Sequence, residues 1–131
     1  MSFITIDKSL YPIIIIRINK EYFEENDAEI YMQEMTKFYE ENAGKGLVII
    51  YDLSLTLLIP EDRRKIGEWL IKKKDIIKNA VKGACYVQPD IFQKLTLKGI
   101  FAVKKPEWAN KIVSSLDEGI KWANELLGIN H

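Results

Sequence analysis

The stretch LVIIYDLS at residues 47–54 determines the fold class that this sequence predicts. Its first five residues are all apolar, which is typical of a strand that is covered on both faces of a sheet. Asp52 and Ser54 follow at once, so the strand is expected to end near Asp52 and to lead into a polar loop. A strand of this kind indicates an α/β protein with helices packed on a sheet.

A helix is expected on either side of this strand. In the preceding segment, Asn26 and Glu29 have the spacing of a capping box, and an apolar stripe with helical periodicity then runs up to Gly44. In the following segment, Pro60 suits the first position of a helix, whose apolar stripe extends as far as Val81. The central strand is therefore expected to lie between two crossover helices.

The outer segments extend the same alternation. Further strands are predicted at residues 3–6, 12–18, 83–87 and 111–114, with a turn at residues 7–9, and further helices after Pro89 and after the Ser115–Glu118 capping box. The predicted fold class is α/β, with a mixed, mostly parallel sheet of about five strands, an N-terminal hairpin and about four helices. No linker or repeat interrupts it, so residues 1–131 are expected to form one domain.

The composition limits the classes of function that the sequence predicts. The formal net charge is zero, so binding to nucleic acid is not expected, because that mode needs a basic excess. Residues 1–65 carry a net charge of −4 and residues 66–131 a net charge of +4, an asymmetry that could steer a charged partner or support a homodimer. The longest aliphatic run, Ile13–Ile16, is too short to cross a membrane, and no signal peptide is recognised. A cytoplasmic location is expected.

Reactive side chains are few. Cys85 is the single cysteine and lies in a predicted buried strand, and His131 is the single histidine and ends the sequence. These counts argue against a nucleophile–histidine pair and against a multi-cysteine zinc site. The protein is therefore expected not to be an enzyme and to need no cofactor or metal.

Several short motifs resemble the STAS domain, and more closely the SpoIIAA-like branch of small bacterial STAS-like proteins. The motifs are Asp52 at the end of the third strand, Arg63 or Arg64 at the start of the next helix, Gly83-Ala84 at the start of the following strand, and Trp122-Ala123 in the last helix. The resemblance implies a regulatory module that binds a protein partner, as anti-sigma-factor antagonists do.

One segment departs from that family. STAS antagonists carry a phosphorylatable serine at the start of the second helix, where this sequence has Pro60-Glu61-Asp62-Arg63. The resemblance therefore implies that the phosphorylation switch is lost and that fixed negative charge takes its place. Ser54 and Thr56 are the nearest hydroxyls that could serve as another switch.

Candidate binding residues follow from the rule that ligands of open α/β sheets bind at the carboxyl ends of the strands. The predicted partner-binding residues are Asp52, Ser54, Thr56, Glu61, Asp62, Arg63 and Arg64. The carboxylates of Asp52, Glu61 and Asp62 could instead hold Mg²⁺ or Ca²⁺, which would make a metal-assisted hydrolase the least favoured alternative. A structural role at a turn and at the helix dipole explains these carboxylates better than a metal site does.

The segment from Leu95 to Val103 is too apolar for a one-sided surface helix. Packing over the sheet explains its composition best, but an apolar ligand could also lie beneath it. The candidate residues for such a ligand are Leu95, Ile100, Phe101 and Trp108. Because SpoIIAA-like proteins resemble CRAL-TRIO lipid carriers in architecture, the resemblance makes a carrier or sensor of an apolar small molecule or lipid the alternative function.

Overall fold

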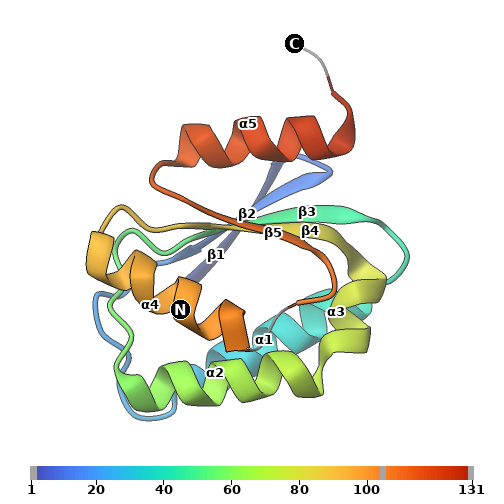
Figure 1. Ribbon diagram of the computed structural model, residues 1–131. Helices are drawn as coiled ribbons and strands as arrows, with labels where there is room; N and C mark the ends of the chain where they lie inside the picture. Colours follow the sequence, from blue (N-terminus) through green and yellow to red (C-terminus); the bar gives the residue numbers. More distant parts are fainter. Residues whose placement is uncertain (1–2, 104–105, 130–131) are drawn as a thin grey trace.

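The computed structural model describes residues 3–103 and 106–129, without the side chains of Ile100 and Val103. A five-stranded sheet forms its centre, in the order β1-β2-β3-β4-β5 (Figure 1). The strands are β1 (Ile4–Leu10), β2 (Ile13–Ile18), β3 (Leu47–Asp52), β4 (Val81–Val87) and β5 (Ala109–Val113). β1 pairs antiparallel with β2, and β2 to β5 run parallel, so the expected mixed sheet with an opening hairpin is confirmed.

Four helices lie on one face of the sheet and a fifth covers the other (Figure 1). The helices are α1 (Asp27–Glu41), α2 (Pro60–Lys72), α3 (Lys74–Ala80), α4 (Ile91–Val103) and α5 (Leu116–Leu127). Strand order equals sequence order, so each crossover steps to its neighbour in the same direction. Because such crossovers are almost always right-handed, the connecting helices α1 to α4 must share a face.

The apolar run in β3 is explained by burial on both faces. Leu47, Ile49 and Tyr51 pack in the core beneath α1 to α4. Val48 and Ile50 point the other way, into the core beneath α5. Alternate side chains therefore serve two separate cores, and neither face tolerates a polar residue.

The opening hairpin turns later than expected. β1 continues through the predicted turn at residues 7–9 and ends at Leu10, with a change of register between Asp7 and Leu10. The Asp7 carboxylate accepts the Ser9 N–H at 2.9 Å, so these turn-forming residues make an irregularity within the strand. The chain reverses at Tyr11-Pro12, whose peptide bond is cis.

The second helix is shorter than expected, which corrects the helix count to five. The backbone departs from helical geometry at Lys73, and α3 begins at Lys74. Ile77 of α3 stays buried beneath the sheet, so the apolar periodicity continues across the break and conceals it in the sequence. Val81 is the first residue of β4 and not the end of a helix. None of the described helices is both long enough and apolar enough to span a membrane.

Of the two predicted helix caps, the one at α5 is confirmed and the one at α1 is wrong. At α5, the Ser115 hydroxyl accepts the Glu118 N–H at 3.2 Å and Gly128 adopts a left-handed conformation, as expected. At α1, the predicted Asn26 capping box is wrong, because Asn26 itself has φ 73° and its side chain caps nothing. The buried carboxylate of Asp27 instead accepts the Glu24 N–H at 2.7 Å and closes the turn that leads into the helix.

Candidate functional site

The loop between β3 and α2 leaves the sheet at the carboxyl end of the parallel strands. Asp52 is half-buried there, and its carboxylate accepts the Ser54 N–H at 3.1 Å and the Ser54 hydroxyl at 2.6 Å. Arg17 of β2 lies 3.6 Å from the same carboxylate. Asp52 therefore stabilises a turn and pairs with a neighbouring strand, while Ser54 is exposed.

Thr56 anchors this loop. Its side chain is buried, and its hydroxyl lies 2.8 Å from the carbonyl oxygen of Lys20, to which it donates a hydrogen bond. The next residue, Leu57, donates its N–H to the carbonyl oxygen of Glu21 at 2.8 Å. These bonds tie the loop to the segment after β2, and they leave the Thr56 hydroxyl no free face for a partner.

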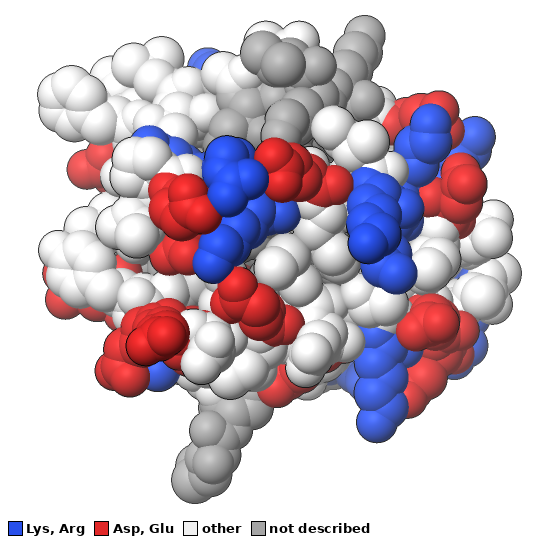
Figure 2. Space-filling view, turned by 90° about the horizontal axis from the view of Figure 1, so that it is seen from below, with Lys and Arg blue, Asp and Glu red and all other residues white. Residues whose placement is uncertain are grey.

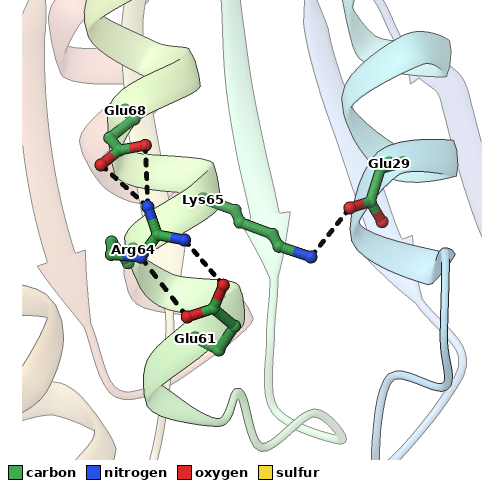
Figure 3. A network of polar contacts seen from close by, with 5 residues as sticks. All are labelled: Glu29, Glu61, Arg64, Lys65 and Glu68. Atoms are coloured by element: carbon green, nitrogen blue, oxygen red, sulfur yellow. Dashed lines mark hydrogen bonds and ion pairs between the residues drawn. The ribbon is translucent and has the colours of Figure 1, made fainter.

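The first turns of α2 carry an exposed charge network (Figure 3). The Arg64 guanidinium donates to Glu61 at 2.6 Å and to Glu68 at 3.0 Å, one helical turn to either side. Arg64 holds the pKa of Glu61 below its ordinary value, mainly through this hydrogen bond. Lys65 reaches across to Glu29 of α1 at 2.9 Å and joins the two helices.

Asp62 and Arg63, between these residues, are half-buried. Burial raises the pKa of Asp62 above its ordinary value. Arg63 donates to the carbonyl oxygen of Leu58 at 3.2 Å, and no carboxylate of the described residues pairs with it. The predicted site residues thus differ in exposure and in their partners, and they do not form one continuous acidic surface.

No metal centre is formed by the residues that the structure describes. They contain no group of three or more histidine, cysteine, aspartate or glutamate side chains placed to hold an ion. Asp52 is engaged by Arg17 and Ser54, and Glu61 is engaged by Arg64. Nothing in this arrangement favours the hydrolase alternative.

Apolar side chains are exposed beside the same loop. Phe92 is 75% exposed, and Ile91 and Leu55 are each 65% exposed. Leu95 and Ile59 are also exposed, and these five residues are called the carboxyl-edge surface below. The loop and the start of α4 are neighbours, because Leu55 and Leu57 line one hollow with Pro89 and Asp90. An apolar loop, LTLLI at residues 55–59, was the signal in the sequence that could have revealed this surface.

An apolar cavity of about 60 Å³ lies beneath α4. Of the predicted ligand residues, Phe101 lines it, Leu95 faces outward and Trp108 belongs to the core. The side chain of Ile100 lies outside what the structure describes. Sequence reasoning missed most of the wall, which comes from three strands, three helices and the loops beside them and includes Tyr31, Tyr51, Leu70, Tyr86 and Leu97.

Charge is distributed evenly over the helical face. On the side formed by α1 and α2, acidic and basic side chains are interspersed (Figure 2). Ion pairs such as Lys65–Glu29 join opposite charges across elements. The opposite net charges of the two halves of the sequence therefore produce no single-signed surface on this face.

Comparison with known proteins supports the fold. No protein-family model matches the chain, and no curated protein matches it. Among solved structures, an uncharacterized protein of the DUF3478 family from Shewanella loihica PV-4 superposes with a TM-score of 0.66 over 92% of this chain and 91% of that chain, at 11% identity. That crystal structure is described as having a SpoIIAA-like fold. At this identity the likeness concerns the fold alone: the chain has a SpoIIAA-like fold.

Proposed function

We propose that this protein is a non-enzymatic regulatory or scaffolding module that binds a protein partner through the carboxyl-edge surface. The observation that carries the proposal is the exposure of Leu55 and Ile59 in the loop before α2, and of Ile91, Phe92 and Leu95 in the neighbouring helix α4. Large apolar patches on a monomer commonly mark interaction sites. Full burial of one such side chain against a partner contributes about 1.5–3 kcal/mol, which helps to offset the cost of association.

Charged and polar residues beside this surface would fix the orientation in which a partner binds. Glu61 and Arg64 hold each other in place on the exposed side of α2, and Ser54 is exposed on the adjoining loop. A polar rim around an apolar centre is the usual arrangement of a protein interface. Thr56 is left out of the proposed surface because its side chain is buried.

The proposal of a non-enzymatic role rests on the state of the reactive groups. Burial raises the pKa of the Cys85 thiol to about 12, so it is neutral and inaccessible at physiological pH. Asp52 and Glu61 are both paired with arginine side chains. His131 lies outside the described residues.

Site-specific photo-crosslinking in the source organism tests the protein-binding proposal. A photoreactive phenylalanine analogue placed at Phe92, at Leu55 or at Ile71 samples three exposed apolar positions, of which Ile71 on α2 lies outside the carboxyl-edge surface. We expect the same covalent adduct from positions 92 and 55 and no such adduct from position 71. An adduct of twice the 15.2 kDa chain mass would identify a second copy as the partner. No adduct at positions 92 and 55, or identical adducts at all three, contradicts the proposal.

A second candidate function, a carrier or sensor of an apolar small molecule, is favoured by the cavity beneath α4. Its volume of about 60 Å³ is well below the roughly 150 Å³ of an engineered protein cavity that binds benzene. A lipid tail does not fit this conformation, whereas a tail of a few carbon atoms does.

A further inference from the structure

The apolar cavity beneath α4 has an exit toward the carboxyl edge of the sheet. A smaller hollow of about 10 Å³ lies beside it. The two share five wall residues, among them Leu58, Arg63 and Leu97. The smaller hollow adds Gln93 and Thr96 of α4, so the wall becomes polar where the path leaves the core.

Arg63 is the charged residue of this exit. It is half-buried, donates one hydrogen bond to the carbonyl oxygen of Leu58, and has no carboxylate within ion-pair distance among the described residues. Its neighbour Arg64 differs, because both Glu61 and Glu68 neutralise it. A half-buried guanidinium without a counter-ion is costly, and a bound anion would offset that cost.

We propose that this cavity binds a small carboxylic acid, with the carboxylate paired to Arg63 and a short apolar tail lying against Ile66, Leu70 and Leu97. The proposal rests on the second candidate function, which it makes specific, and it is independent of the carboxyl-edge surface. A guanidinium matches a carboxylate through two parallel hydrogen bonds, which fixes the ligand at the exit.

Charge and size both favour a monocarboxylate. Glu61 and Asp62 precede Arg63 in the first turn of α2, so a doubly charged phosphate head would be repelled more strongly than a single carboxylate. The cavity volume limits the tail to a few carbon atoms unless α4 moves.

Methyl-detected NMR titration of the full chain at neutral pH tests the proposal. The probes are butyrate, acetate, dodecanoate and the uncharged analogue 1-butanol. We expect butyrate to shift the methyl signals of Ile66, Leu70 and Leu97, which line the cavity, and not those of Val48 or Ile50 in the opposite core. Acetate should bind about 10-fold more weakly because it lacks two methylene groups, and dodecanoate should not bind.

Three variants distinguish the contribution of the Arg63 charge to binding from the contribution of the apolar cavity. Arg63→Gln should weaken butyrate binding at least about 10-fold and leave 1-butanol binding unchanged, because only the charged head contacts residue 63. Arg64→Gln, the matched control on the exposed side of α2, should leave both affinities unchanged. Leu97→Trp should abolish binding of both probes by filling the cavity.

The outcomes distinguish the two claims. Equal butyrate affinity in wild type and Arg63→Gln overturns the carboxylate assignment while apolar binding stands. Shifts confined to methyls outside the cavity overturn both the carboxylate assignment and apolar binding in this cavity. Absence of binding by both butyrate and 1-butanol overturns the second candidate function as well. If Arg63→Gln does not fold, the Leu97→Trp variant decides, since retained butyrate binding in that variant contradicts the proposed site.

Discussion

Asp27 is the one charged residue that is buried among those the structure describes. Its carboxylate accepts the backbone N–H of Glu24 at 2.7 Å and the Lys20 ammonium at 2.9 Å. The backbone hydrogen bond is the main reason that the pKa of Asp27 lies below its ordinary value, and Lys20 lowers it further. This single side chain thereby connects the end of β2 to the start of α1.

We predict that Asp27→Asn lowers the free energy of unfolding by about 1–3 kcal/mol at pH 7, because the charged acceptor of both bonds is lost. The folded-state pKa of Asp27 is depressed, so its stabilising effect is present above the ordinary value of 3.8 and is lost as pH falls through the lower folded value. Urea unfolding of both proteins should therefore show a wide difference in the free energy of unfolding at pH 7, and this difference should narrow as pH falls below 3.8. A difference that is constant with pH would contradict this role.

At the level of single elements, α5 packs closely against β4. At Gly83 of β4, an added Cβ would lie 3.1 Å from the carbonyl oxygen of Ala109, 3.1 Å from the Trp122 ring and against Leu126 of α5. Glycine is therefore required at this position by packing and not by its φ angle. Gly99 of α4 is a useful contrast, since nothing lies within 4 Å of its added Cβ.

Alanine substitutions at these two glycines are expected to change the free energy of unfolding in opposite directions. Gly83→Ala should lower the free energy of unfolding by about 1–3 kcal/mol, because Trp122 and the β5 backbone must shift. Gly99→Ala should raise it by about 0.5–1 kcal/mol, because alanine favours the helix and meets no obstacle. Thermal or chemical unfolding of the two variants measures both. A loss of stability in Gly99→Ala equal to that in Gly83→Ala would show that α4 is packed more tightly than the structure indicates.

At the scale of the whole molecule, the helices differ in how many of their side chains are buried against the sheet. α1 buries six residues, including Met35 and Tyr39, whereas α4 has no buried side chain among its described residues. α5, alone on its face, still buries Gly119 and Ala123. The cavity beneath α4 follows from this difference, because a helix with few buried side chains does not fill the space between itself, α2 and the sheet.

This inequality predicts that α4 opens locally while the rest of the fold stays intact. Amide hydrogen exchange should be at least about 10-fold faster in α4 than in α5, a helix of similar length, because local opening costs less where fewer apolar contacts are broken. Mass spectrometry of peptides from the two helices provides the measurement. Equal protection of α4 and α5 would contradict the prediction.

The sequence by itself determined the opening hairpin, the mostly parallel sheet and the N-terminal cap of α5. These features depend on local chemistry: the apolar run of β3 and the Ser115–Glu118 capping box each operate within a few residues. The break at Lys73 escaped detection because the apolar periodicity continues across it. The prediction of a turn at residues 7–9 was wrong because Asp7 makes a hydrogen bond typical of a turn, to the Ser9 N–H, while it lies inside a strand.

Only the tertiary structure decided which side chains remain available for binding. The Thr56 hydroxyl donates to carbonyl oxygens 36 and 38 residues earlier in the chain. Arg63 has no carboxylate partner within the described part of the chain, whereas Arg64 beside it has two. The cavity likewise takes its walls from segments as distant as Ile18 and Phe101. Burial and ion pairing depend on where remote segments meet, and local sequence patterns carry no record of that geometry.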